Sequence, residues 1–198
     1  NSAVGLRSMP VRYLFLDEVD GYPLDVEGEG DAISMAEART RTFARRKIFI
    51  VSTPTISGAS AIEREYEASD QRRYFVPCPH CSHRQWLRFE QLRWDKGTPE
   101  TAAYVCEACD TAIAEHNKTW MLEHGEWRAM AQGKTAGFHL SSLYSPVGWR
   151  SWRDIAAAWE AAVNKESGSA AAIKTFKNTE LGETWVEEGE APDWQRLV

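Results

Sequence analysis

Cysteines are scarce in this chain and long hydrophobic segments are missing, which excludes several classes of protein. Only four of the 198 residues are cysteine, whereas disulfide-stabilised secreted scaffolds are shorter and much denser in cysteine. No apolar run approaches the roughly 18 residues of a membrane-spanning helix, and no signal-like segment opens the sequence. Because the chain begins at Asn1 without an initiator Met, we expect a processed chain or a part of a longer protein.

Positive charge is not in excess either. Lys and Arg number 23 against 29 Asp and Glu, so the net charge is −6. This balance argues against a simple basic domain that coats DNA, although it leaves room for a local basic patch. Hydrophobic residues make up 43% and charged residues 26%, the composition of a folded globular chain. All nine Trp lie at position 86 or later, so we expect two structural units.

A phosphate-binding loop of the form GxxxxGK[ST] is also missing from the sequence. In proteins that have it, this loop surrounds the phosphates of a nucleotide with backbone N–H groups. Without such a loop, we expect this chain alone to bind nucleotides weakly and to hydrolyse ATP poorly or not at all.

What is present in the first 69 residues is an alternation of strands and helices. Residues 11–16 form a mostly apolar run, and residues 47–51 form a second one rich in β-branched side chains; both are typical of buried parallel strands. Helices are expected at about 32–46 and at about 60–69, each after a residue that is favoured as a helix N-cap. This alternation predicts an α/β fold with a parallel sheet and flanking helices.

Polar residues follow both predicted strands, at the edge where parallel sheets place their active sites. Asp17 and Glu18 end the first strand, and Ser52 and Thr53 end the second. In ATP-hydrolysing motors, one such carboxylate joins the Mg²⁺ shell and the next activates the attacking water, while a hydroxyl senses the γ-phosphate. Each pair alone also fits a plain strand end at the surface. Together they favour half of an ATPase site.

The four cysteines form two CxxC pairs with 24 residues between them. Tetrahedral Zn²⁺ is held by such pairs in zinc ribbons, where a small hairpin joins two metal-binding knuckles. We therefore expect a closed, structural zinc site with the ligands Cys78, Cys81, Cys106 and Cys109. The alternatives are free thiols or redox-active pairs, and His80 and His83 beside the first pair are rival ligands.

The last third of the chain predicts a short strand at 138–140 and helices at about 151–166 and from Gly168 to about Leu181. The residues from Glu183 onward are acidic and read as a linker.

The basic segment and the Trp-rich second half of the chain each allow two interpretations. The basic segment Arg39–Lys47 is either a solvated helix face or a surface that contacts DNA or a neighbouring subunit's nucleotide. The Trp-rich second half is either core or a platform for stacking bases.

Several motifs resemble, in order, those of the large terminase subunits of lambda-type tailed bacteriophages. Residues 12–23 (RYLFLDEVDGYP) resemble that family's Walker B region, and residues 48–55 (IFIVSTPT) its coupling motif. The zinc ribbon at 78–109 is similar to an insertion in the family. Residues 137–146 (GFHLSSLYSP) and 176–185 (FKNTELGETW) also resemble segments of the family. The resemblance covers nearly the whole chain.

This resemblance implies a motor that packages viral DNA by hydrolysing ATP with Mg²⁺ and that cuts concatemeric DNA with a metal-dependent nuclease domain. Asp17 would bind Mg²⁺, Glu18 would be the catalytic base, and Ser52 and Thr53 would couple hydrolysis to movement. The fold would be a partial P-loop-type parallel sheet that carries a zinc-ribbon insertion. The phosphate loop is expected before Asn1 and the nuclease acids beyond Val198.

The resemblance also implies a division of the chain and a set of partners. Residues 1–75 would be the second half of the ATPase core, 76–128 the zinc ribbon, and 129–198 a return to the ATPase core with an acidic linker. The partners would be double-stranded DNA, the small terminase subunit, the portal and procapsid, and further copies in a ring. The location would be the host cytoplasm, without membrane contact. The alternative function is a non-catalytic zinc-ribbon module that binds DNA or protein.

Overall fold

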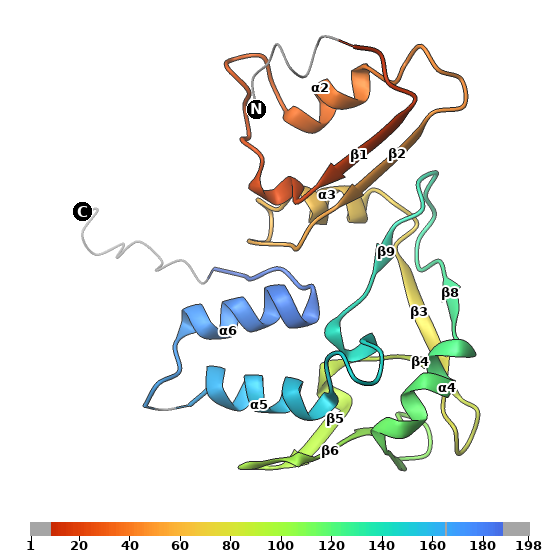
Figure 1. The fold of residues 1–198 in the computed structure, drawn as a ribbon, viewed down its shortest axis with the longest axis vertical. Helices are drawn as coiled ribbons and strands as arrows, with labels where there is room; N and C mark the ends of the chain where they lie inside the picture. Colours follow the sequence, from red (N-terminus) through yellow and green to blue (C-terminus); the bar gives the residue numbers. More distant parts are fainter. Residues whose placement is uncertain (1–8, 165, 188–198) are drawn as a thin grey trace, which may run out of the picture.

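The computed structural model describes residues 9–164 and 166–187, which form an N-terminal unit (residues 9–69) and a C-terminal unit (residues 70–187). Figure 1 shows the N-terminal unit at the top, with the remainder below it. No helix within these ranges has the length and hydropathy to cross a membrane.

The N-terminal unit is built on two parallel strands, β1 (Tyr13–Asp17) and β2 (Lys47–Val51). Helices α2 (Ala32–Ala38) and α3 (Ala61–Glu67) accompany them. The small core of this unit is made of Leu16, Val19, Ile33 and Ala36. The predicted mixed α/β class and parallel pairing are confirmed. The parallel sheet has only these two strands in the described residues, so a complete P-loop fold remains a prediction.

Helix α2 is shorter than the helix predicted at 32–46. It begins after Asp31, whose carboxylate accepts a hydrogen bond from the backbone N–H of Ser34, as expected of an N-cap. It ends at Ala38, and turns follow. The hydroxyl of buried Thr40 donates to the Glu37 carbonyl over 2.8 Å. Such local side-chain bonds compete with helix continuation, which the apolar spacing alone does not reveal.

The C-terminal unit contains two small sheets. In one, β3 pairs with β4 and β8 antiparallel and with β9 parallel; in the other, β6 lies between β5 and β7. The bounds of these strands are β3 Arg72–Pro77, β4 Arg84–Trp86, β5 Leu92–Asp95, β6 Thr98–Val105, β7 Ala112–Ile113, β8 Glu126–Arg128 and β9 Phe138–His139.

Three helices complete this unit: α4 (Lys118–Glu123), α5 (Trp152–Ala162) and α6 (Ala170–Phe176). A capping box of Ser151 and Asp154 opens α5, which ends at Ala162, before the predicted end near 166. Helix α6 continues as a π-helical turn over Lys177–Leu181 and stops at Gly182, whose φ of 64° is the expected left-handed cap.

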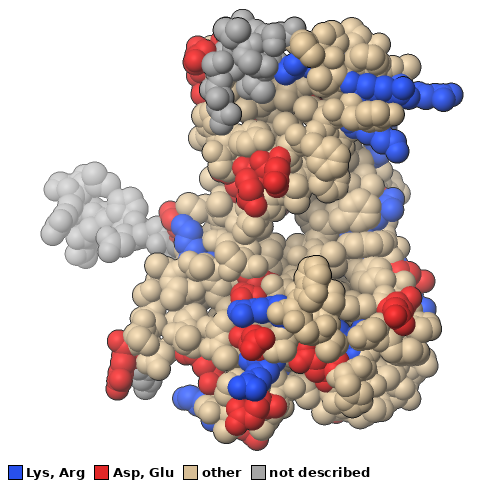
Figure 2. Space-filling model, viewed as in Figure 1, with Lys and Arg blue, Asp and Glu red and all other residues tan. Residues whose placement is uncertain are grey.

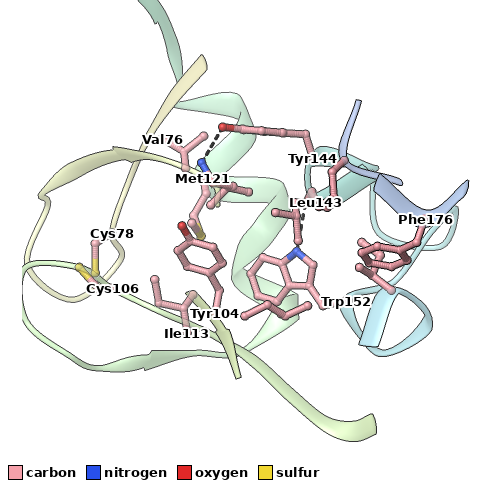
Figure 3. Close-up of a cluster of buried hydrophobic side chains, with 14 of the residues drawn as sticks. Val76, Cys78, Tyr104, Cys106, Ile113, Met121, Leu143, Tyr144, Trp152 and Phe176 are labelled. Carbon is pink, nitrogen blue, oxygen red and sulfur yellow. Dashed lines mark hydrogen bonds between the residues drawn. The ribbon is translucent and has the colours of Figure 1, made fainter. Parts of the chain in front are cut away.

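One core joins the region of the four cysteines to the helices that follow it. Trp152 and Tyr104 are fully buried in its centre, and the Trp152 indole N–H donates to the Leu143 carbonyl over 3.0 Å. Figure 3 shows Cys78 and Cys106 at one side of this core. Residues 141–181 belong to the segment 129–198 that was expected to rejoin the ATPase core, and they pack on the region of the four cysteines. Among the described residues, β1 and β2 gain no third strand.

Candidate functional site

The carboxyl ends of β1 and β2 bring the predicted polar residues together. Asp17 pairs in register with Val51, so Glu18 lies next to Ser52. Glu18 has a φ of 52°, which turns its side chain across the strand ends. Its carboxylate accepts from the Ser52 hydroxyl over 3.4 Å and from the Thr53 backbone N–H over 3.5 Å. The geometry thus assembles three of the four predicted residues around one carboxylate.

The fourth, Asp17, lies at the same edge with a different environment. It is exposed, and no hydrogen-bond donor contacts its carboxylate within the described residues. An exposed carboxylate without a partner has its oxygens available for water or for a hydrated cation. The two adjacent acids therefore differ: Glu18 is held by hydrogen bonds, and Asp17 is open to solvent.

A third acid, Asp20, belongs to the same site, and sequence reasoning gave it no role. Its backbone N–H donates to the Ser52 hydroxyl over 3.1 Å. Its carboxylate accepts from the Thr55 hydroxyl over 2.7 Å and from the Ile62 backbone N–H over 2.8 Å. The available signal was its position, three residues after Asp17 in the same motif. Its partners, 32 to 42 residues away, leave no local pattern.

The segment that follows β2 pairs with the end of the described chain. Trp185 donates its backbone N–H to the Thr55 carbonyl over 2.9 Å and accepts from the Ser57 N–H over 2.9 Å, which forms a parallel bridge at Ile56. The Asn178 side chain also donates to the Thr55 carbonyl over 2.8 Å. The segment that follows Ser52 and Thr53 is therefore hydrogen-bonded, at Thr55 and Ser57, to Asn178 and Trp185.

The second candidate site is the cysteine cluster. All four sulfurs lie within 4.8 Å of one another, with Cys78–Cys109 at 3.9 Å and Cys81–Cys106 at 3.8 Å. Four thiolates around a tetrahedral Zn²⁺ with bonds of about 2.3 Å are separated by about 3.8 Å. A disulfide would need about 2.05 Å. The spacing fits a tetrahedral metal site, and the four cysteines are not joined by disulfides.

The two CxxC turns repeat one backbone pattern. In the first, the N–H of His80 donates to the Cys78 sulfur, the N–H of Ser82 donates to the Cys78 carbonyl, and Ser82 has a φ of 61°. In the second, Ala108 and Asp110 make the same two bonds to Cys106, and Asp110 has a φ of 53°. Such N–H groups stabilise thiolate charge, as in zinc knuckles.

Comparison with known proteins decides the family. A family model described as the ATPase domain of the phage terminase large subunit gpA matches residues 1–127, and one described as the endonuclease domain of the terminase large subunit gpA matches residues 135–198. The chain belongs to the phage terminase large subunit family.

Two curated relatives agree with this. The chain is 32% identical over 223 residues to the terminase large subunit of Enterobacteria phage P21, which covers 100% of this chain and 34% of the relative. It is 29% identical over 218 residues to that of Escherichia phage lambda, which covers 97% and 33%. The chain thus spans about a third of the length of these terminases. No solved structure matches it.

The terminase models also bear on the division of the chain. The endonuclease model begins at residue 135, inside the segment 129–198 that the sequence assigns to the ATPase core. In the structure, residues 141–181 pack on the region of the four cysteines. The same last part of the chain also contacts the segment after β2, through Asn178 and Trp185.

Electrostatics at the cysteine cluster are uneven. Burial raises the pKa of Cys78 to about 12. Hydrogen bonds from Thr111 lower the pKa of Cys109 to about 6. Without a cation, four neighbouring thiolates would repel one another and the buried thiols would stay protonated. A divalent metal offsets that cost, so the donor set of four sulfurs with N–H support fits Zn²⁺.

The rival histidines do not join the sulfurs. The His83 ring lies 3.0 Å from Glu107, and His80 contributes its backbone N–H to the knuckle. Within the described ranges, the metal-competent group around the knuckles consists of the four cysteines alone.

The exposure of side chains bears on two other interpretations of this terminase chain, those of the basic segment Arg39–Lys47 and of the Trp-rich second half. Arg41, Arg45, Arg46 and Lys47 are all exposed, and none of them has a carboxylate partner within residues 9–187 as described. Figure 2 shows Lys and Arg projecting from one flank of the N-terminal unit, away from the acidic groups. Among the Trp residues, Trp152 is fully buried, whereas Trp149 is 83% exposed.

Proposed function

We propose that this chain supplies the Walker B and coupling elements of a terminase motor that hydrolyses ATP to package double-stranded DNA. The observation that carries the proposal is the meeting of Glu18 with Ser52 and Thr53 at the carboxyl ends of two parallel strands. Nucleotide sites of parallel sheets lie at this edge. The family match supports an ATPase assignment for residues 1–127.

The roles follow from the different environments of the two acids. Glu18 is the proposed general base, because the Ser52 hydroxyl and Thr53 N–H orient its carboxylate toward the open edge. Asp17 is the proposed ligand of the hydrated metal, since its oxygens face solvent. Mg²⁺, when bound with ATP, neutralises charge on the phosphates. Ser52 and Thr53 are proposed coupling residues, because their bonds to Glu18 change when the carboxylate gains a proton.

The zinc ribbon is proposed to be structural. Its four sulfurs lie within 4.8 Å of one another and would hold Zn²⁺ as a closed site, with no position left for a substrate. Cys78 and Cys106 are fully buried in the core of the C-terminal unit, so the metal would stabilise the surface on which α5 packs.

The larger assembly remains part of the proposal, because the chain spans a third of its relatives. The full-length protein would take the phosphate loop and the rest of an endonuclease from residues outside this sequence. It would act on concatemeric DNA with the small subunit, the portal and procapsid, and further copies in a ring, in the host cytoplasm. We also propose that residues 1–75 belong to the ATPase core, and that residues 135–198, which the endonuclease model matches, lead into the nuclease.

The alternative is a zinc-ribbon module that binds DNA or protein without catalysis. The clustering of Glu18, Ser52 and Thr53 disfavours it, since a binding module does not require a hydrogen-bonded carboxylate at a strand end.

Replacing Glu18 by Gln in the full-length protein tests the proposal. Gln keeps the size of the side chain but cannot accept the proton, so ATP turnover should fall at least about a hundredfold while ATP binding persists. Glu27→Gln is the matched control, because Glu27 is exposed in the neighbouring loop. Near-normal turnover in Glu18→Gln would show that Glu18 is not the base.

A further inference from the structure

Asp20 bonds to three residues in two other segments at the edge of the candidate ATPase site. Its N–H reaches Ser52, and its two carboxylate oxygens reach Thr55 and the backbone of Ile62. The first two partners follow β2, and the third lies in the first turn of α3. One short side chain therefore fixes the loop after β1, the loop after β2 and a helix relative to one another.

The loop that presents Asp20 is itself anchored. Val19 is 1% exposed and packs into the core of the N-terminal unit, so Asp20 and Glu18 extend from a fixed point on either side of it. The Ser52 hydroxyl accepts from Asp20 and lies within hydrogen-bond distance of both the Glu18 carboxylate and the Thr53 carbonyl. A shift of Asp20 therefore moves the hydroxyl that contacts Glu18.

A second carboxylate extends these contacts to the C-terminal unit. Glu63, next to Ile62 on α3, accepts from Ser57, from Gly58 and from the Thr184 hydroxyl. Burial alone would raise the pKa of Glu63, but the hydrogen bonds from Thr184, Gly58 and Ser57 lower it below its usual value. Helix α3 is thus held by Asp20 on the site side and linked to residue 184 by Glu63.

We infer that Asp20 is a positioning residue: it sets the Ser52 hydroxyl for Glu18 and ties that setting, through Thr55 and α3, to residues 178–185. The inference rests on the proposed ATPase function. It adds a path of hydrogen bonds from the candidate ATPase site to residues 178–185. The covalent path from α3 into the ribbon takes at least ten residues from Glu67 to Cys78, whereas Thr55 is one hydrogen bond from Trp185 and one from Asn178. The shorter route leads into the range that the endonuclease model matches.

Asp20→Asn and Thr55→Val in the full-length protein test the inference. Asn keeps one acceptor for Ile62 but loses the charge that holds Thr55, and Val removes the hydroxyl without changing the shape of Thr55. We expect kcat for ATP turnover to fall about tenfold in Asp20→Asn and at least about threefold in Thr55→Val, with KM changed less than about threefold. The double variant should be no worse than Asp20→Asn, because both remove the same bond.

Asp25→Asn is the matched control. Asp25 is exposed in the same region and its carboxylate only accepts from Gly28 and Gly30, so turnover should stay within about twofold. Thr55→Ser restores the hydroxyl and should restore kcat. Zinc content and the thermal midpoint report folding, and if Asp20→Asn does not fold, the Val and Ser variants of Thr55 still decide.

Two results would overturn the inference: turnover in Asp20→Asn and Thr55→Val equal to that of Asp25→Asn, or an equal loss in Thr55→Ser and Thr55→Val. Failure of the proposed function looks different, since Glu18→Gln would then retain turnover.

Discussion

The N-terminal and C-terminal units differ in how much apolar surface they bury. The C-terminal unit encloses Trp152 and Tyr104 completely. In the N-terminal unit, one face of the β1–β2 sheet leaves Phe15 76% and Phe49 48% exposed, with their rings 4.9 Å apart. The proposed chemistry thus lies in the unit that buries less apolar surface, while the cysteine cluster lies in the well-packed unit. An exposed aromatic face of this kind is what additional structure would cover in a larger ATPase.

The largest effect is expected from loss of the proposed zinc site, which should unfold part of the C-terminal unit and leave the N-terminal unit unaffected. Cys106→Ser removes a fully buried ligand, and metal binding at structural sites supplies on the order of 10 kcal/mol of folding free energy. We expect loss of one zinc per chain by elemental analysis, and loss of hydrogen-exchange protection across residues 76–128 and α5. His83→Ala is the control and should keep its zinc. Zinc-free protein purified without chelator would refute the site.

Substitutions of aromatic residues should also affect the two units differently, with smaller losses in the free energy of unfolding than the loss of zinc. Trp152→Ala empties a fully buried position and should lower the free energy of unfolding by about 3–5 kcal/mol. Phe15→Ala removes an exposed ring and should cost about 1 kcal/mol or less, mostly from its contact with Phe49. Chemical denaturation measures both. Equal losses would mean that the two faces are buried alike in solution.

A pH effect is expected at β9, near the boundary of the units. Burial and the adjacent Arg73 lower the pKa of His139 to about 4, below the 6.5 of an unfolded chain. The folded state therefore binds this proton less readily, and stability falls as pH drops from 6.5 toward 4, by at most about 3 kcal/mol. Denaturation midpoints at pH 7.5 and 4.5 measure this. His139→Gln should flatten the dependence; an unchanged slope would assign it to other groups.

The smallest effect concerns the basic segment Arg39–Lys47. If these exposed cations contact the DNA backbone, the Arg45→Ala, Arg46→Ala double variant should reduce the salt dependence of DNA binding by about two phosphate contacts, a slope change of about 1.8. Fluorescence anisotropy across salt concentrations measures it. Arg93→Ala, Arg153→Ala in the C-terminal unit is the matched control. An identical slope in both variants would leave the segment as a solvated face.

The sequence predicted those features that depend on interactions between residues close together in the chain. Both parallel strands, the N-caps at Asp31 and Ser60, and the Gly182 stop follow from short runs of sequence. The cysteine cluster was predictable because each knuckle is one turn, and only two knuckles had to meet.

The sequence did not predict the contacts between distant segments or the ends of two helices. The ends of α2 and α5 were placed too late. The Thr40 hydroxyl bonds to the Glu37 carbonyl just after α2, and α5 ends at Ala162 with Val163 as its C-cap. The bridge between Ile56 and Trp185 joins residues that share no motif. The role of Asp20 depends on Thr55 and Ile62, so the carboxylate looked like one more loop acid.

The π-helical turn at Lys177–Leu181 has a consequence for the evolution of this chain. A π turn is an α-helical turn with one residue inserted, and each residue of an α-helix advances the chain by about 100°. Deleting one residue there would restore a regular helix and rotate everything after it, so Asn178 and Trp185 could no longer both reach Thr55. Insertions and deletions in this stretch should therefore be rare among related sequences, while amino-acid replacements at its exposed positions are tolerated.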